Sequence, residues 1–270
     1  MSNQPLVSVI IVTYKPNLNY ISNAIDSIKK QNYKNIEIII ICDEPSLNTD
    51  EFFRNIIEEN KNIVYKNNLK KSNVAVARNQ WIFLSKWKYI AMLDDDDIWN
   101  DTDKIKKQVE FLEKNTDYSL VGVNKLYIID EQWNTKYVMN MRESDTEIRN
   151  TILQSCQFAH SGMIFRKEIL EKSWIYNTPW AEDYDLWFRI WKFSKFCNID
   201  SSIMYREYKG SLSQRQNLKL RIEAFKLFWK YKKYYPNFLK ALIFRIWEFI
   251  LPDKVKRFIL KKFKKNWINN

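Results

Sequence analysis

Runs of branched aliphatic residues alternate with segments of helical spacing through the first hundred residues of the chain. Four continuous apolar runs are typical of strands buried on both faces, at residues 7–13, 36–42, 63–65 and 89–93. Apolar residues recur at helical intervals in four other segments, at residues 17–30, 52–60, 73–86 and 105–114. This alternation predicts βαβ units. We therefore expect an α/β fold with a mostly parallel, Rossmann-like sheet flanked by helices.

The second half of the chain is less regular. Strand-like segments occur at residues 120–130, 162–165 and 203–208, and an aromatic segment with helical spacing occurs at residues 182–193. We find no internal repeat and no low-complexity linker in the sequence. From residue 219 onward the composition changes, and the chain becomes helical, aromatic and cationic.

Four consecutive aspartates, at positions 94–97, follow the strand predicted at 89–93. Adjacent like charges repel, so such a run needs a compensating cation or full solvation. Polar residues also end two other predicted strands, namely Thr13-Tyr14 and Asp43. Ligands bind beyond the carboxyl ends of parallel strands, so the pattern favours a divalent metal and a diphosphate there. A solvated acidic turn that caps the next helix is the alternative that the aspartates alone leave open.

The composition excludes several other classes of protein. With only 3 glycines, the chain contains neither a P-loop nor a G-x-G-x-x-G motif, which argues against nucleoside triphosphatases and dinucleotide dehydrogenases. The three cysteines, Cys42, Cys156 and Cys197, are odd in number and scattered. They are typical of a reducing compartment and lack the spacing of a zinc site. No signal peptide is expected from the first residues.

The positive charge of the chain is concentrated at its C-terminal end. Residues 219–270 contain 15 of the 44 Lys and Arg residues and 3 of the 32 acidic residues. Their net charge of +12 equals the net charge of the whole chain. Residues 238–251 form an apolar helical face beside a polar arc of Lys240, Arg245 and Glu248, and residues 255–267 show a second amphipathic pattern. This basic amphipathic helical tail predicts binding to an anionic membrane surface, although the first helix is too short and too charged to span it. A helix pair packed on the body is the main alternative. We expect no nucleic-acid partner.

Several spaced segments carry a resemblance to a known family. They are residues 7–14, residues 37–43, Ala77-Arg78-Asn79, residues 93–99 and residues 182–187. In this order and spacing the chain resembles the family 2 glycosyltransferases, over roughly residues 6–215. The resemblance implies a GT-A fold in residues 1–215, with a nucleotide-sugar half at about 1–100 and an acceptor half at about 101–215. Residues 216–270 then form the membrane-associating tail.

The resemblance also implies roles for the donor-side residues. Thr13 and Tyr14 line the uridine pocket, and Asp43 contacts the nucleoside. The other residues implied to bind the nucleotide sugar are Arg78, Asp94 and Asp95. Asp94 and Asp96 form the D-x-D element that holds Mn2+ or Mg2+, with Asp96 as the direct ligand. Carboxylate oxygens are hard ligands, which these two ions prefer.

Asp183 is implied as the catalytic base, since the attacking hydroxyl must lose its proton. The alternative for Asp183 is an acid in the first turn of a helix, where the helix dipole favours it. The residues implied on the acceptor side are His160, Glu182, Asp97 and Trp99. The tryptophans are more typical of a core, and the lone histidine of a structural residue. Asp185 and Arg189, four positions apart, are expected to form a structural pair.

The activity implied by the resemblance is metal-dependent, inverting transfer of a hexose from a UDP-sugar, with UDP-glucose or UDP-galactose favoured. The expected acceptor is a saccharide linked to polyprenyl diphosphate, as in the synthesis of bacterial O-antigen or capsule. The protein is then expected in the cytoplasm, attached peripherally to the inner face of the plasma membrane. Two other classes stay open. A sugar nucleotidyltransferase also uses carboxylates and a metal, and a non-catalytic membrane scaffold needs only the tail.

Overall fold

The structure is a computed structural model that describes residues 4–43, 45–68, 78, 79, 82, 88–173, 176, 181–208 and 217–250. The elements of the first half are β1 (Val7–Tyr14), α1 (Leu18–Lys29), β2 (Ile36–Asp43), α2 (Leu47–Glu59), β3 (Ile63–Asn68), β4 (Tyr89–Met92) and α4 (Lys104–Lys114). They confirm the alternation of strands and helices predicted from the sequence. The helix predicted at 73–86 lies almost entirely outside the described residues.

The second half contains the elements β5 (Tyr118–Ile129), β6 (Thr135–Asn140), α5 (Asp145–Thr151), η1 (His160–Gly162), β7 (Ile164–Arg166), α6 (Lys167–Ser173), α7 (Glu182–Ile190), β8 (Lys195–Arg206), α9 (Asn217–Tyr231) and α10 (Phe238–Ile250). The strand predicted at 162–165 begins at Ile164, because the preceding residues form the single turn η1. The strand predicted at 203–208 is the end of the longer β8. The prediction omitted β6, α5 and α6.

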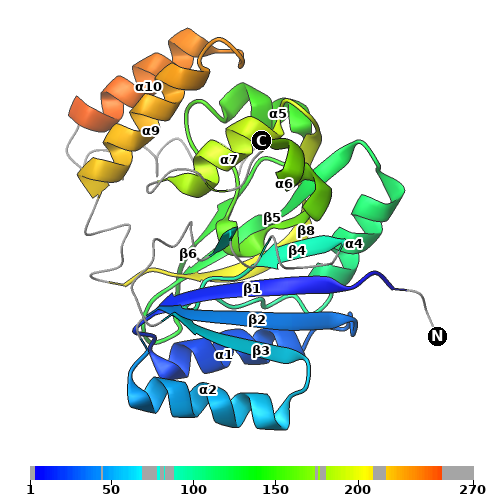
Figure 1. The fold of residues 1–270 in the computed structure, drawn as a ribbon. Helices are drawn as coiled ribbons and strands as arrows, with labels where there is room; N and C mark the ends of the chain where they lie inside the picture. Colours follow the sequence, from blue (N-terminus) through cyan, green and yellow to red (C-terminus); the bar gives the residue numbers. More distant parts are fainter. Residues whose placement is uncertain are drawn as a thin grey trace.

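The described strands form one eight-stranded sheet (Figure 1). Its order is β3-β2-β1-β4-β7-β5-β6, and β8 pairs with β5. The predicted parallel arrangement is confirmed from β3 to β4. Beyond β4 the sheet is mixed, because β7 runs antiparallel to both β4 and β5, and β6 runs antiparallel to β5. The carboxyl ends of β1, β2 and β4 therefore share one edge, and the residues that precede β7 reach the same edge.

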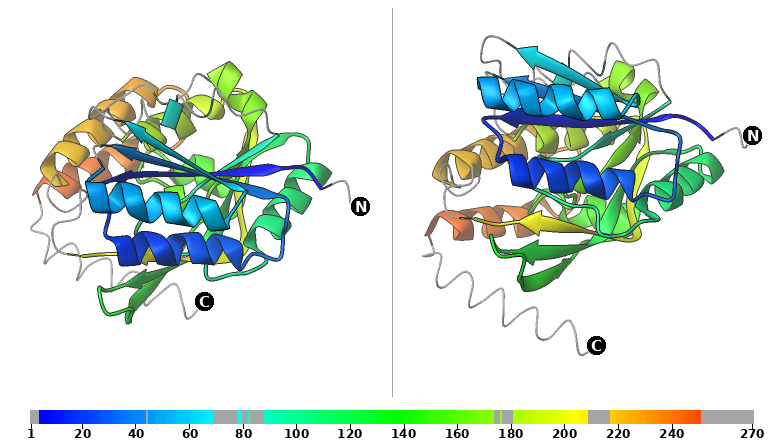
Figure 2. Two further views of the ribbon diagram at one scale, coloured as in Figure 1. Left: turned by 60° about the horizontal axis from the view of Figure 1, so that its bottom comes forward. Right: turned by 90° about the horizontal axis from the view of Figure 1, so that it is seen from below.

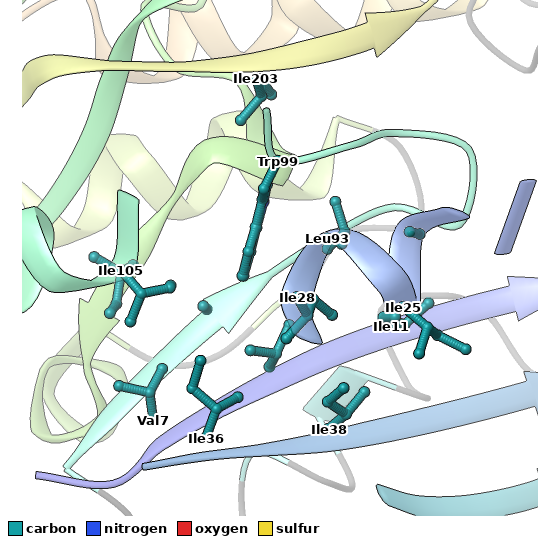
Figure 3. Close-up of a cluster of buried hydrophobic side chains, with 14 of the residues drawn as sticks. Val7, Ile11, Ile25, Ile28, Ile36, Ile38, Leu93, Trp99, Ile105 and Ile203 are labelled. Atoms are coloured by element: carbon teal, nitrogen blue, oxygen red, sulfur yellow. The ribbon is translucent and has the colours of Figure 1, made fainter. Parts of the chain in front are cut away.

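Helices cover both faces of the sheet (Figure 1 and Figure 2). Side chains of α1, α2 and α4 pack in one apolar cluster with alternate residues of β1, such as Val9 and Ile11. Ile10 points to the opposite cluster, which contains side chains of α5, α6, α7 and α9. Figure 3 shows the first cluster, in which Ile25 and Ile28 of α1 face Ile11 and Ile38 of the sheet. Burial of each such side chain contributes about 1.5–3 kcal/mol, which explains the continuous apolar runs.

The two described helices of the C-terminal tail pack on α7. The rings of Phe188 on α7 and Tyr231 on α9 stack with centroids 4.8 Å apart. Arg245 of α10 is 4% exposed and donates hydrogen bonds to the carbonyl of Leu153 and to the hydroxyl of Tyr184, at 3.1 and 2.8 Å. Arg245, which the sequence places on the polar arc of this helix, is thus buried and hydrogen-bonded to the body. The helix predicted at 255–267 lies outside the described residues, and the domain boundary near residue 215 stays a prediction.

Candidate active site

Polar residues gather at the carboxyl ends of β1, β2 and β4, as predicted. Tyr14 and Asp43 are register partners in β1 and β2. The aspartate loop, defined here as residues 94–97, follows β4. The hydroxyl of Thr13 on β1 donates a hydrogen bond to a carboxylate oxygen of Asp95. Thr13 and Asp43 are buried, whereas Tyr14 is 41% exposed. The structure thus brings these predicted donor-side residues to one edge of the sheet.

Arg78 joins the aspartate loop to the first turn of α7. Its guanidinium Nη2 lies 3.1 Å from Asp94 Oδ1, and its Nη1 lies 2.7 Å from Glu182 Oε1. Asp94 Oδ1 also lies 3.3 Å from His160 Nδ1, while His160 Nε2 lies 3.1 Å from the hydroxyl of Tyr176. Arg78 is only 7% exposed, so the guanidinium side of both ion pairs is shielded from water. Charge-assisted bonds of this kind are strong and directional, and they fix the spacing between the loop and α7.

Ser161 and Arg206 hold the aspartate loop in its conformation. Ser161 donates its hydroxyl to one carboxylate oxygen of Asp97 and accepts a hydrogen bond from the backbone N–H of Asp94. The backbone N–H of Arg206 donates to the other oxygen of Asp97 at 2.9 Å, and its Nε donates to the carbonyl of Asp96 at 3.1 Å. Because Asp97 is 1% exposed and both oxygens are engaged, the geometry favours a supporting role over the acceptor-side contact predicted for it.

The guanidinium of Arg206 is itself held on both sides. It lies 4.1 Å from the ring centroid of Tyr20 and 4.0 Å from that of Trp133, and its Nη1 donates to the carbonyl of Asp130 at 3.0 Å. Cation–π contact with two rings restrains the orientation of a planar guanidinium. The prediction from sequence did not assign a role to Arg206, Ser161 or Tyr176. Arg206 meets Asp96 across 110 positions of the chain, a contact that local spacing does not signal.

Burial and mutual repulsion raise the pKa of three of the four aspartates. Burial raises the pKa of Asp95 to about 6, and the charge of Asp94 adds to the effect. Burial, followed by the charges of Asp95 and Asp94, raises the pKa of Asp96 to about 7. Burial and the same kind of repulsion raise the pKa of Asp97 well above its usual range. Burial also acts upward on the pKa of Asp94, but His160 and the bridging guanidinium outweigh it and lower that pKa.

This excess of carboxylates fits a hard divalent cation. A nearby cation favours the ionised form of each carboxylate and relieves the repulsion between them. In the part of the chain that the structure describes, no group of three His, Cys, Asp or Glu side chains is arranged to bind a metal ion without further ligands. Magnesium commonly uses one or two carboxylates and completes its shell with substrate phosphates and water. The residues present therefore fit the predicted Mn2+ or Mg2+, and the choice of Asp96 and Asp94 as ligands stays a prediction.

Asp183 lies in the first turn of α7, next to Glu182. Ala181, just before the helix, has a left-handed backbone (φ 49°, ψ 39°) that is uncommon for a residue other than glycine. Asp183 Oδ1 accepts a hydrogen bond from the backbone N–H of Tyr184 at 2.7 Å. Burial, and then the charge of Asp183, raises the pKa of Glu182. Asp183 is half-buried.

Trp99, predicted on the acceptor side, is buried in the core. It is 2% exposed, and its indole N–H donates to the carbonyl of Ser161 at 2.6 Å. The ammonium group of Lys104 lies 4.0 Å from the centroid of the Trp99 ring. Figure 3 shows the ring among aliphatic side chains of the first cluster. The geometry therefore favours the structural role that was the alternative for this residue.

Comparison of the sequence with known proteins identifies its family. Residues 8–174 match the model of the Glycosyl transferase family 2. The Escherichia coli protein WfaP, described as UDP-Glc:alpha-D-GlcNAc-diphosphoundecaprenol beta-1,3-glucosyltransferase, is 33% identical over 219 residues, which cover 77% of this chain and 80% of WfaP. An uncharacterized glycosyltransferase of Methanocaldococcus jannaschii is 28% identical over 274 residues, covering 96% of this chain and 92% of that protein.

Solved structures share the fold at low sequence identity. A mannosyltransferase from Pyrobaculum calidifontis, in complex with GDP-Man and Mn2+, has a TM-score of 0.63 and 15% identity to this chain. The match covers 83% of this chain and 65% of the mannosyltransferase chain. S. aureus TarS 1-349, in complex with UDP-GlcNAc, has a TM-score of 0.65 and 16% identity over 90% of this chain and 73% of its own. These likenesses confirm the predicted GT-A fold. Since the family model covers more than half of its length, the chain belongs to glycosyl transferase family 2.

Proposed function

We propose that this glycosyltransferase moves a hexose from a UDP-sugar to a hydroxyl group of a lipid-linked saccharide, with inversion at the anomeric carbon. UDP-glucose and UDP-galactose are the favoured donors. The proposed acceptor is a saccharide on polyprenyl diphosphate, of the kind from which bacterial surface polysaccharides such as O-antigen and capsule are built. The description of WfaP, which names UDP-Glc and a GlcNAc-diphosphoundecaprenol acceptor, supports UDP-glucose as the donor and the polyprenyl diphosphate acceptor.

The bridge that Arg78 makes between Asp94 and Glu182 carries this proposal. It holds the aspartate loop, proposed to face the diphosphate of the donor, beside the helical turn that contains Asp183. Transfer in one step needs the leaving group and the base at the same carbon in a fixed geometry, and such positioning supplies much of the rate. A buried guanidinium with two carboxylate partners gives that fixed spacing before any substrate binds.

In the proposed reaction, Asp183 accepts the proton of the acceptor hydroxyl as the hydroxyl oxygen attacks C1 of the sugar. The bond between C1 and the diphosphate oxygen breaks, and its electron pair leaves with UDP. One displacement at one carbon inverts its configuration and needs no covalent intermediate. When bound, Mn2+ or Mg2+ supplies Lewis-acid stabilisation of the charge that develops on the diphosphate.

The donor-binding roles follow from the arrangement at the edge of the sheet. The nucleoside is proposed to lie against Thr13, Tyr14 and Asp43, since these residues end the two adjacent strands β1 and β2. The diphosphate is proposed to lie at the aspartate loop, with the cation held by Asp96 and Asp94. Thr13 restrains Asp95 through their hydrogen bond, and this contact couples the nucleoside end of the pocket to the loop.

Incubating the purified protein with Mn2+ and each of a panel of UDP-sugars tests the function. We expect slow release of UDP from one UDP-hexose, and none after the metal is chelated. Release of pyrophosphate from UTP and a sugar 1-phosphate, with no UDP-sugar consumed, would instead identify a sugar nucleotidyltransferase. Binding to membranes without turnover of any UDP-sugar would identify a scaffold.

Replacing Arg206 with Lys is expected to weaken metal activation. Lysine keeps the charge but loses the fork that donates to the carbonyls of Asp96 and Asp130, a loss of about 1.5–3 kcal/mol for hydrogen bonds from a charged group. We expect the Mn2+ concentration for half-maximal activity to rise about tenfold. Arg54→Lys, at an exposed surface ion pair, is the matched control. A variant that melts earlier but keeps the wild-type Mn2+ dependence would show that Arg206 serves stability alone.

A further inference from the structure

Helix α10 carries an apolar stripe on the side that faces away from the body. Four aliphatic side chains recur at helical intervals and are between 44 and 71% exposed, namely Leu239, Ile243, Ile246 and Ile250. On the opposite side, Ala241 is 0% exposed and Arg245 is 4% exposed. A helix that packs on a protein by one face normally turns a polar face to water. The outer side of α10 departs from that rule.

Helix α9 repeats the pattern. Leu218, Ile222 and Trp229 are 64, 41 and 54% exposed, and Phe225 lies on the same side. The opposite side of α9 is buried and contains Leu227, Phe228 and Tyr231. The ring of Phe225 contacts Phe249 of α10, with centroids 5.9 Å apart, so the two helices lie against each other. Since both helices bury their inner sides, the two stripes form one outward apolar surface, called here the outer face.

A groove runs along the outer face of α9. Its volume is about 610 Å³, and it is lined by Phe225, Lys226, Trp229 and Lys230. The rings of Phe225 and Trp229 and the aliphatic stems of the two lysines give the groove an apolar lining, which suits a lipid chain. The helices as a pair are visible at the upper left of Figure 1, beside α7.

The outer face is joined firmly to the helix that contains Asp183. Asp185 of α7 is 0% exposed, and one of its oxygens accepts hydrogen bonds from Lys230 Nζ and from the hydroxyl of Tyr231, each at 2.9 Å. Its other oxygen lies 2.7 Å from Arg189 Nε, which confirms the predicted pair. These bonds link α9 to α7 through a buried carboxylate, so the position of the outer face is set relative to Asp183.

We propose that the outer face inserts into the interfacial region of an anionic membrane and holds the active site at a set height above it. The charge of the chain argues for lipid in preference to another copy of the protein. Residues 219–270 contain 15 basic and 3 acidic residues, which attract anionic headgroups and repel an identical surface. No helix in the described ranges has the length and apolar character to cross a bilayer.

Flotation with vesicles tests this docking. Vesicles of phosphatidylglycerol and phosphatidylcholine are compared with vesicles of phosphatidylcholine alone, and the wild type is expected to float with the first. The variant with Ile243→Ser and Ile246→Ser, called here the stripe variant, is expected to bind at least about tenfold more weakly, because two inserted aliphatic side chains are lost. Its matched control carries Leu47→Ser and Val138→Ser, two exposed aliphatic positions on other faces, and is expected to bind like the wild type.

Three outcomes would overturn the docking proposal, provided that circular dichroism shows folded variants. The first is equal binding by the stripe variant and the wild type. The second is an equal loss in the matched control. The third is a wild-type dimer in light scattering that the stripe variant converts to monomer with vesicle binding unchanged, which would make the outer face a dimer interface.

The proposal that the outer face sets the height of the active site above the membrane rests on the proposed function. The proposal that the outer face binds the membrane does not. Release of UDP from the donor in solution is expected to be unchanged in the stripe variant. Transfer to a polyprenyl-linked acceptor in vesicles is expected to fall with vesicle binding, while transfer to a water-soluble acceptor is retained. If the wild type floats with vesicles but turns over no UDP-sugar, the proposed function fails and the docking surface stands.

Discussion

Replacing Asp183 with Asn is expected to remove turnover while leaving the binding of UDP intact. The amide has nearly the same shape and its oxygen can still accept from the backbone N–H of Tyr184. It cannot accept the proton of the acceptor hydroxyl, and loss of a general base costs about 10²–10⁴-fold in rate. The measurements are kcat with a fixed acceptor and the heat of UDP binding in the presence of Mn2+.

The control for this variant is Asp26→Asn, which removes an exposed carboxylate from α1 and should leave both measurements unchanged. Wild-type kcat in Asp183→Asn would exclude Asp183 as the base. Loss of UDP binding together with kcat would instead assign Asp183 to the donor pocket. In that case Glu182, which is held by Arg78 in the same turn, becomes the residue to test.

Replacing Asp96 with Ala is expected to abolish metal-dependent transfer. Lewis-acid stabilisation of a departing diphosphate supplies several kcal/mol, so its loss lowers kcat/KM by about 10³-fold. Burial, and then the charges of Asp95 and Asp94, raise the pKa of Asp96 to about 7, and a bound cation would favour the ionised form of this carboxylate. Mn2+ binding is measured directly by calorimetry, and transfer is measured across a range of Mn2+ concentrations.

Asp117→Ala is the control for Asp96→Ala. Asp117 pairs with Lys195 at the surface and is 55% exposed, so removing it deletes one carboxylate without touching the aspartate loop. We expect wild-type Mn2+ binding and transfer from this control. If the wild type keeps full activity with all divalent metal chelated, the metal site is rejected whatever the Asp96 variant does.

The first half of the fold was predictable because its strands are buried on both faces. Such strands are continuous apolar runs, and β1, β2 and β4 were all found at their predicted places. β6 was missed for the opposite reason, since its side chains are mostly exposed at the edge of the sheet and show no buried alternation. The helices α5 and α6 span seven residues each, which is too short for a helical period to show.

The candidate site was predictable where it depends on strand ends, as with Thr13, Asp43 and the aspartate loop. The residues that hold the loop were not, because their contacts cross long stretches of the chain. Ser161 meets Asp97 across 64 positions, and neither residue has a local pattern that indicates the other. The burial of Arg245 was not predictable from a helical wheel, because the wheel contains no information about the oxygens of Leu153 and Tyr184 that accept its hydrogen bonds.

The antiparallel strand β7 beside β4 has a consequence for hybrid enzymes. Its direction delivers Ser161 to the end of β4, and Arg206 arrives there from the end of β8. The two residues that hold the aspartate loop, Ser161 and Arg206, thus come from the later part of the polypeptide. A hybrid enzyme can join the first hundred residues of one homologue to the remainder of another. Its aspartate loop then comes from one parent, and the residues that orient the loop come from the other. Such a hybrid is expected to keep the conformation of the aspartate loop only when both parents have serine and arginine at these two positions.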